Sequence, residues 1–349
     1  MDFNGRNRLA WGILGTGSIA RTFAQGIKAG RMGRLLGVAS RTAAKAASFA
    51  RDFGAERSYG SYRKLLDDPG IQAVYISTPH PQHARWSVAA ARAGKHILCE
   101  KPMGMNAAEA GKVLSEARRR KVFFMEAFMY RCHPQTLKLA GLLRRKAVGE
   151  VRWIKAVFGF QTDCSPRSRL WSRALGGGGI LDVGCYPVSM SRLLAGAALG
   201  RGPAEPLEVS AVGSLGPTGV DAYSAALFKF PGGIVAQLEC AVGLRLGSYV
   251  EVIGDKGRIH VPEPWTPSRE GGTTSISITD GSGRAREIRV AVKEGLYSLE
   301  ADTVARAIAD GRAPYPAMGP EDSLGNMRAL DRWRKAIGLS YPADQRRVR

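Results

Sequence analysis

The sequence predicts an α/β fold: a doubly wound parallel sheet in residues 1–130, followed by an α+β domain in residues 131–349 with a large open, mostly antiparallel sheet. Three observations support this prediction. Short apolar runs alternate with amphipathic stretches over the first 130 residues, which is typical of a parallel sheet with helices on both faces. A glycine-rich turn joins the first apolar run to the first amphipathic stretch. After residue 130, strand-like segments follow one another with Gly and Pro turns between them.

The first 130 residues hold five predicted strands and four predicted helices. The strands are residues 9–14, 35–40, 73–78, 96–100 and 122–127, and the helices are residues 19–29, 42–53, 82–93 and 107–120. The last helix follows Asn106 and has Glu109 three residues further on, which is typical of a capping box.

The remaining chain is richer in strands. Those we predict are residues 150–160, 207–214, 221–230, 233–241, 249–254, 257–261, 275–279 and 287–292. One helix is expected near residues 180–194, and two more at residues 297–310 and 321–337 close the chain. The pattern leaves open whether these closing helices pack back on the first domain.

The net charge of +21 is the unusual feature of the composition, with 51 Lys and Arg against 30 Asp and Glu in 349 residues. Such an excess suggests nucleic acid or an anionic membrane as a partner. It is spread along the chain, however, because residues 1–130 hold 21 basic and 9 acidic residues and the rest hold 30 and 21. We therefore expect no nucleic-acid binding. No apolar run reaches the roughly 18 residues of a membrane span, so no membrane partner is expected either.

The five cysteines are scattered and form no C-x-x-C pair, which is typical of a reduced intracellular chain and favours neither a disulfide scaffold nor structural zinc. No cluster of His, Cys and carboxylates has the spacing of a metal site. The first residues carry no export signal. These features predict a cytoplasmic protein without a bound metal.

The glycine-rich turn reads Gly15-Thr16-Gly17-Ser18-Ile19-Ala20. Its first glycine permits a tight turn, its second lets a pyrophosphate approach the backbone, and Ala20 is small enough for close packing of helix on strand. The helix that begins there offers free N–H groups to phosphates. We expect residues 15–19 to bind the cofactor in a Rossmann domain; a tight turn without a ligand is the alternative.

The end of the second strand indicates which nicotinamide cofactor is bound. An NAD site needs a carboxylate about 20 residues beyond the glycines to hold the ribose 2′-hydroxyl. Between Gly15 and Asp52 the chain has no acidic residue; it has Ser40, Arg41 and Lys45 instead. A hydroxyl and a guanidinium suit a 2′-phosphate. NADP(H) is therefore favoured, while NAD(H) stays possible if Arg41 is only a solvated loop residue.

Two later segments carry residues suited to proton transfer. Glu100 and Lys101 end the fifth strand, at the sheet edge where ligands meet an open α/β sheet. Asp182 and Tyr186 follow a run of four glycines and lie on one face if the segment is helical. A lysine beside a phenol lowers the phenol's pKa, which would let Tyr186 act as general acid or base. Each residue also has a structural alternative: a strand end, a helix cap or half-buried packing.

Nearly the whole chain resembles the Gfo/Idh/MocA family of NAD(P)-dependent oxidoreductases, and within it the branch of glucose–fructose oxidoreductase, xylose dehydrogenase and dimeric dihydrodiol dehydrogenase. The segments that carry the resemblance are GTGSIA at 15–20, STPHPQH at 77–83, AGKHILCEKPMGMNAAEA at 93–110, EAFMYRCHPQ at 126–135, GGGGILDVGCYPV at 176–188 and PEDSLGNMRALDRWR at 320–334.

The resemblance implies roles for individual residues. Lys101 corresponds to the family's catalytic lysine, ahead of a cis bond to Pro102, and Asp182 and Tyr186 match its D-x-G-x-Y site. Tyr186 stands where inositol dehydrogenases carry histidine, which favours an aldose or dihydrodiol. The expected cofactor neighbours are Thr78, Pro79, His83, Glu100 and Lys101, and the expected substrate contacts are Arg131, Arg169 and Trp171.

The predicted activity is reversible hydride transfer between the nicotinamide and a hydroxyl-bearing carbon of a sugar or dihydrodiol, with Lys101 and Tyr186 in acid/base roles. Two alternatives remain open: a sugar–sugar oxidoreductase that never releases its cofactor, and an NAD(P)-binding regulator without catalysis. The resemblance also implies a homodimer or homotetramer formed through the C-terminal sheet.

Overall fold

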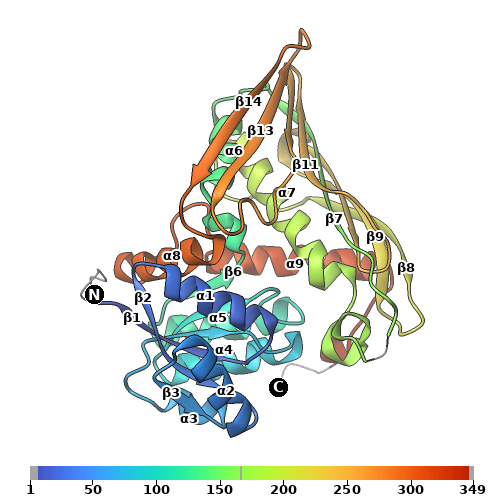
Figure 1. Ribbon diagram of the computed structural model, residues 1–349. Helices are drawn as coiled ribbons and strands as arrows, with labels where there is room; N and C mark the ends of the chain where they lie inside the picture. The colour runs from blue at the N-terminus through green and yellow to red at the C-terminus, as the bar shows by residue number, and fades with distance from the viewer. Residues whose placement is uncertain (1–6, 166, 346–349) are drawn as a thin grey trace.

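The computed structural model describes residues 7–165 and 167–345, which form two sheets joined by closely packed helices (Figure 1). The first sheet is parallel throughout, in the order β3-β2-β1-β4-β5-β6. Its strands are β1 (Leu9–Leu14), β2 (Gly33–Ala39), β3 (Arg57–Tyr59), β4 (Ala73–Ile76), β5 (His96–Glu100) and β6 (Phe124–Ala127). This order is that of a Rossmann fold, with ligands expected at the carboxyl ends of the strands. The predicted fold class is confirmed.

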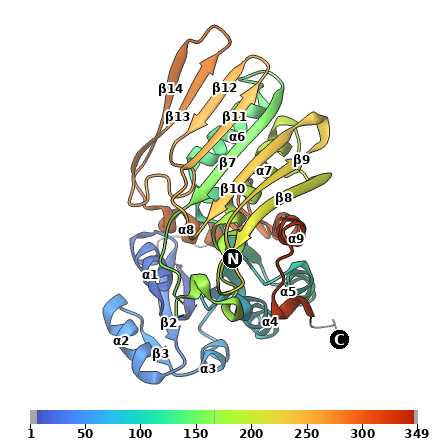
Figure 2. The same ribbon diagram turned by 90° about the vertical axis from the view of Figure 1, so that its right-hand side faces the viewer.

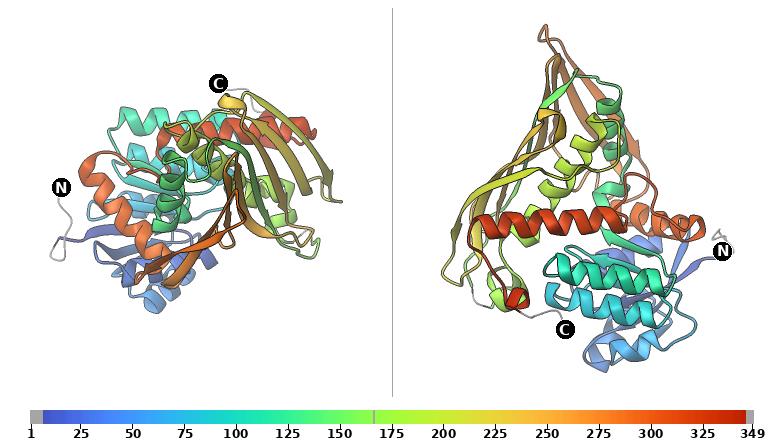
Figure 3. Two further views of the ribbon diagram at one scale, coloured as in Figure 1. Left: turned by 90° about the horizontal axis from the view of Figure 1, so that it is seen from above. Right: turned by 180° about the vertical axis from the view of Figure 1, so that it is seen from behind.

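Helices cover both faces of this sheet: α1 lies on one, and α4 and α5 lie on the other (Figures 1 and 3). The helices are α1 (Ser18–Ala29), α2 (Ala43–Phe53), α3 (Tyr62–Leu66), α4 (His83–Arg92) and α5 (Ala107–Arg119). At the start of α5 the Asn106 side chain accepts the Glu109 N–H at 2.9 Å, as predicted. The Glu109 carboxylate accepts the Met105 N–H rather than that of Asn106, so the capping box is shifted by one residue.

Among the strands and α-helices of the described residues, three were not predicted: β3, α3 and α6 (Pro134–Arg144). The first two are only three and five residues long, too short to show a periodicity. The start of α6 did carry a signal, because Pro134 occupies its first turn and the His133 side chain accepts the Gln135 N–H at 3.0 Å. The strand predicted at residues 73–78 ends at Ile76 in the structure, and Ser77 and Thr78 therefore lie in the loop after β4.

The second sheet has the strand order β14-β13-β12-β11-β7-β10-β9-β8 and is antiparallel except between β7 and β10. Its strands are β7 (Val151–Gly159), β8 (Glu208–Leu215), β9 (Asp221–Lys229), β10 (Val235–Ala241), β11 (Ser248–Gly254), β12 (Gly257–Val261), β13 (Gly272–Asp280) and β14 (Ala285–Val292). Helices α6 and α7 (Cys185–Ala198) pack on one face. Figure 2 looks onto the other face, which no helix of the described residues covers.

The closing helices α8 (Leu296–Asp310) and α9 (Pro320–Ala336) pack back on the Rossmann part, α8 on α1 and α9 on α5 (Figure 3). Gly26 permits the first contact, since a Cβ there would lie 2.7 Å from that of Tyr297. The Asp302 carboxylate accepts the Arg31 and Met32 N–H groups at 3.0 to 3.2 Å. These contacts hold the two sheets in a fixed relation and close one wall of the cavity described next.

Candidate active site

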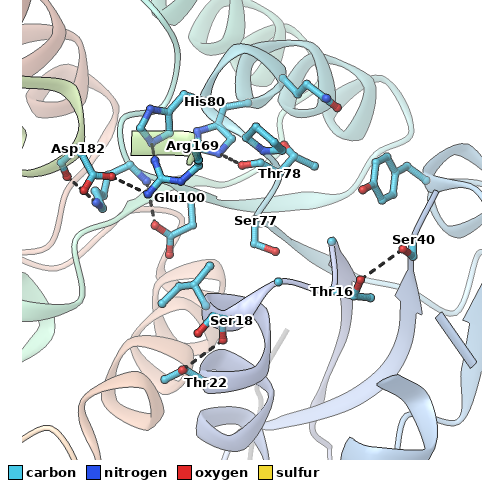
Figure 4. A pocket seen from close by; sticks show the side chains of 18 of the residues that line it. Thr16, Ser18, Thr22, Ser40, Ser77, Thr78, His80, Glu100, Arg169 and Asp182 are labelled. Atoms are coloured by element: carbon cyan, nitrogen blue, oxygen red, sulfur yellow. Dashed lines mark hydrogen bonds and ion pairs between the residues drawn. The ribbon is translucent and has the colours of Figure 1, made fainter. Parts of the chain in front are cut away.

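A cavity of about 860 Å³ lies where the carboxyl ends of β1, β2, β4 and β5 meet the chain that leads into α7. Figure 4 shows Thr16, Ser18 and Ser40 at one end and His80, Arg169 and Asp182 at the other. Every predicted cofactor residue lines this cavity: Gly15, Thr16, Gly17, Ser18, Ile19, Ser40, Arg41, Lys45, Thr78, Pro79, His83, Glu100 and Lys101. The structure thus brings segments from the first 101 residues into one site.

The glycine-rich turn leaves room for a ligand at the start of α1. Gly15 has φ +118°, and a Cβ there would lie 2.8 Å from Ser77 Oγ. At Gly17, no described atom outside the adjoining backbone lies within 4 Å of the position that a Cβ would occupy. No described side chain caps α1, so its first N–H groups are available to phosphates. Buried Thr78 Oγ1 also lacks a partner among the described residues. A dinucleotide fits this turn.

The part of the cavity between the glycine-rich turn and the end of β2 is basic. Thr16 Oγ1 and Ser40 Oγ lie 3.3 Å apart, and exposed Arg41 and Lys45 line the cavity beside them. The Thr42 hydroxyl accepts the Lys45 N–H and caps α2. None of the described residues that line the cavity here is acidic, which suits a 2′-phosphate better than a bare ribose hydroxyl.

Lys101, Asp182 and Tyr186 meet at the far end of the cavity. The Lys101 ammonium donates to the Asp182 carbonyl oxygen at 2.7 Å and lies 4.8 Å from the centre of the Tyr186 ring. The peptide bond between Lys101 and Pro102 is cis. The chain carrying Asp182 is a π-helical turn (Ile180–Gly184) that continues as α7. Asp182 therefore orients Lys101 through its main chain, which leaves its carboxylate for another partner.

That partner is Arg169, whose guanidinium donates to Asp182 Oδ1 at 2.7 Å. Burial opposes ionisation of Asp182, but the Lys101 and Arg169 cations outweigh it and hold its pKa below the usual range. His80 Nδ1 lies 3.0 Å from the Gly176 carbonyl oxygen, and Nε2 lies 3.3 Å from the guanidinium. Burial and the adjacent Arg169 cation lower the pKa of His80, so this histidine is neutral. The site thus holds an ionised carboxylate beside two cations.

Tyr186 differs from the prediction made from sequence. The Lys101 ammonium lies over the ring face instead of beside the hydroxyl, and the nearest described partner of that hydroxyl is Met129 Sδ at 3.7 Å. Burial raises the pKa of Tyr186 well above its ordinary value. The expectation of a lowered phenol pKa is wrong for this arrangement, because burial is the largest effect on the phenol and disfavours its charged form. The hydroxyl is protonated and has a proton to donate.

Of the three predicted substrate contacts, only Arg169 lines the cavity. Arg131 is 1% exposed and turns toward α7 and α9, where it donates to Asp322 Oδ2 at 2.5 Å and to Ser189 Oγ at 2.8 Å. Trp171 is buried, and its indole N–H donates to Thr162 Oγ1 at 3.0 Å. Both side chains lie outside the site and hold neighbouring segments together.

The His83 side chain connects two loops that line the cavity. Its Nε2 lies 2.6 Å from the Thr78 carbonyl oxygen and its Nδ1 lies 2.7 Å from that of Pro102. The side chain thus ties the loop after β4 to the loop that follows Lys101, and it shapes the cavity wall rather than offering a free nitrogen.

Several cavity residues were not on the predicted list. They are Thr22, Thr42, Tyr62, Ser77, His80, Gln82, Met129, Arg269 and Tyr297. Ser77, His80 and Gln82 lie inside the segment 77–83 that carries the resemblance, so the signal was there. Arg269 and Tyr297 come from the loop before β13 and from α8. Their place depends on the packing of α8 against α1, which no local motif reveals.

Within residues 7–165 and 167–345, no helix has the length and apolar character needed to cross a bilayer. The same part of the chain gathers no group of three His, Cys, Asp or Glu side chains suited to a metal ion.

Comparisons with known proteins agree with this geometry. Residues 9–128 match the model "Oxidoreductase family, NAD-binding Rossmann fold", and residues 136–260 match the "GFO/IDH/MocA C-terminal domain". Trans-1,2-dihydrobenzene-1,2-diol dehydrogenase of Mus musculus is 33% identical over 348 residues, which cover 97% of this chain and 99% of that protein. The enzyme of the same name from Homo sapiens is 31% identical, with the same coverage of both chains.

Two solved structures share the whole architecture. A 3-ketoreductase from Actinomadura kijaniata, in complex with NADP and TDP-benzene, has a TM-score of 0.84 and 27% identity, covering 95% of this chain and 98% of that one. An aldose–aldose oxidoreductase from Caulobacter crescentus, complexed with glycerol, has a TM-score of 0.84 and 26% identity with the same coverage. The chain therefore belongs to the GFO/IDH/MocA family and is an oxidoreductase with an NAD-binding Rossmann fold.

Proposed function

We propose that the protein transfers a hydride reversibly between NADP(H) and a hydroxyl-bearing carbon of a dihydrodiol or a sugar. The observation that carries this proposal is the meeting of Lys101, Asp182 and Tyr186 at the end of a cleft that begins at the glycine-rich turn. The names of the relatives support the substrate class, since they include dihydrodiol dehydrogenases and an aldose–aldose oxidoreductase.

When bound, the nicotinamide supplies the hydride acceptor or donor. The protein positions the substrate and transfers the proton. In the direction of reduction, the protonated Tyr186 hydroxyl donates its proton to the reacting oxygen. The Lys101 ammonium stabilises negative charge that develops on that oxygen. Asp182 holds Arg169 in place, and the remaining N–H groups of the guanidinium can donate a hydrogen bond to a second hydroxyl of the substrate. Oxidation runs through the same groups in reverse.

A fluorescence titration with NADPH, followed by a screen for NADP⁺ reduction with dihydrodiols and aldoses, tests the proposal. We expect saturable NADPH binding and turnover of at least one member of the panel. Binding without any turnover would favour the non-catalytic regulator. Cofactor that stays with the protein through gel filtration and is reduced by one sugar and reoxidised by another would favour the sugar–sugar oxidoreductase, which the aldose–aldose neighbour makes the second candidate.

Arg41 is the proposed ligand of the 2′-phosphate. We expect Arg41→Ser to weaken NADPH binding about 10- to 100-fold and to leave NADH binding nearly unchanged. Loss of one charge-assisted hydrogen bond typically lowers affinity by this factor. Equilibrium titrations with both cofactors measure this. Arg51→Ser is the matched control, because Arg51 is exposed on α2, the helix that follows Arg41, and lies outside the cavity. An equal loss for both cofactors, or a preference of the unmodified protein for NADH, would contradict the assignment.

The open face of the second sheet is the proposed contact between copies of the chain. Large apolar side chains stand on it: Val212 is 74% exposed, Leu227 47% and Tyr223 44%. On this face Val212 of β8 lies opposite Ala225 of β9, and Ala225 lies opposite Glu239 of β10. Glu239 forms an ion pair with Lys155 of β7 at 3.3 Å. A face that mixes apolar and paired charged residues suits a self-complementary contact.

We expect light scattering to give two or four times the chain mass of 37.5 kDa for the unmodified protein. Val212→Lys should lower the mass toward that of one chain, because it places like charges against each other across a symmetric contact. A monomer in the unmodified protein would refute this contact.

A further inference from the structure

The last two of the four glycines before the π-helical turn, Gly178 and Gly179, lie against a buried carboxylate. Asp221, the first residue of β9, is fully buried, and its Oδ2 accepts the Ile180 N–H at 2.6 Å. The Gly179 N–H also interacts with this carboxylate. The other oxygen, Oδ1, has no hydrogen-bond partner among the described residues. Burying a carboxylate is costly, so two main-chain donors at a helix start are a specific arrangement rather than a by-product of packing.

The glycines are needed because the carboxylate comes so close. Gly178 has φ +106°, and a Cβ there would lie 2.2 Å from Asp221 Oδ1. A Cβ at Gly179 would lie 3.2 Å from Oδ2. On the other side, a Cβ at Gly177 would lie 2.7 Å from the carbonyl oxygen of Arg169. The glycine segment 177–179 therefore passes between Asp221 and the segment that carries Arg169, where a side chain would collide with one or the other.

The residues that follow are those of the proposed chemistry. Ile180 begins the turn that holds Asp182, and α7 carries Tyr186 one turn later. Lys101 donates to the main-chain oxygen of Asp182, so the path of this turn sets the position of the ammonium as well. We propose that Asp221 is a positioning residue: by holding the Ile180 N–H, it fixes the turn that places Asp182 and Tyr186 relative to Lys101. This inference rests on the proposed function.

The ionisation of Asp221 gives this role a pH dependence. Burial raises its pKa to about 7, against the opposing effects of the Ile180 N–H and of Arg334 on α9. Tyr341 and, on β10, Cys240 also face it. A protonated carboxyl is the weaker acceptor. Turnover should therefore rise as the pH increases through about 7, when the carboxylate forms and holds the turn.

The test compares Asp221→Ala with Asp221→Asn. The alanine variant loses the acceptor, and we expect turnover to fall about 100-fold, the scale of a misplaced catalytic group, with NADPH affinity unchanged within about twofold. The asparagine variant keeps an amide oxygen for the Ile180 N–H, so it should recover most of the turnover and lose the rise near pH 7. Hydrogen exchange of peptides covering residues 178–186 should quicken in the alanine variant alone.

Asp255→Ala is the matched control, because Asp255 also accepts a main-chain N–H group, that of Glu150 at 2.8 Å, and lies outside the cavity. It should lower stability and leave turnover and the 178–186 peptides unchanged. If Asp221→Ala does not fold, Gly178→Ala is used as the test variant instead, because its added Cβ displaces the Asp221 carboxylate. Normal exchange and normal turnover in these variants would overturn the inference, as would equal losses of turnover and NADPH affinity. Exchange needs no substrate, so the inference is decided even if the unmodified protein turns over none of the panel.

Discussion

Replacing Tyr186 by phenylalanine should lower turnover about 100-fold or more and leave the affinity for NADPH unchanged within about twofold. The change removes one hydroxyl and keeps the ring, which packs edge-on against Phe128 and Phe158 with centroids 5.3 and 5.2 Å away. The substrate would still bind beside Lys101, but no group would exchange a proton with the reacting oxygen. Initial rates with NADP⁺ and a substrate from the panel, together with an NADPH titration, measure both quantities.

Tyr130→Phe is the control for this variant. Tyr130 is buried, stacks on Tyr186 with centroids 5.8 Å apart, and donates its hydroxyl to Ser189 Oγ at 2.9 Å, outside the cavity. It should keep nearly full turnover. Near-normal turnover in the Tyr186 variant, or an equal loss in both variants, would remove Tyr186 from its proposed role.

Replacing Lys101 by methionine should lower turnover about 100- to 1,000-fold, since it removes the charge that stabilises the reacting oxygen. It should also change the pH profile in a predictable direction. Lys101 is the main cation that lowers the pKa of Asp182, so its loss raises that pKa. The limb set by Asp182, which lies at lower pH than the rise near 7 assigned to Asp221, therefore moves to higher pH, because Asp182 must be ionised to hold Arg169.

Rates measured across the pH range, with the unmodified protein and Lys101→Arg alongside, check this prediction. The arginine variant keeps a charge and should lose less than the methionine variant. If the limb set by Asp182 did not move, Asp182 would not depend on Lys101 for its ionisation, and unchanged turnover would exclude Lys101 from the chemistry.

The sequence predicted the parts of the fold that depend on local pattern. Alternating apolar and amphipathic segments predicted the parallel sheet, and the glycine-rich turn and Arg41, which were expected at one site, both line the cavity. The positions of Lys101, Asp182 and Tyr186 came from the resemblance as well as from their places at element ends. Short or exposed elements such as β3 were missed, because three residues carry no periodicity.

What could not be predicted depends on long-range packing. Arg131 was expected at the substrate, yet its guanidinium meets Asp322, 191 residues away, in a buried ion pair. The raised pKa of Tyr186 follows from burial that only the assembled fold creates. Asp221 gave no sign of its place beside Ile180, 41 residues away, although the glycine run already marked a close approach of backbone to some other group.

The most direct test of the account follows the hydride itself. The protein is incubated with NADP⁺ and with aldoses deuterated at C1, or with trans-1,2-dihydrobenzene-1,2-diol deuterated at the hydroxyl-bearing carbons, and the NADPH formed is analysed by mass spectrometry. We predict NADPH that carries deuterium at C4 of the nicotinamide for at least one of these substrates. NADPH binding with no reduction by any of them, or NADPH formed without deuterium, would contradict direct hydride transfer at this site.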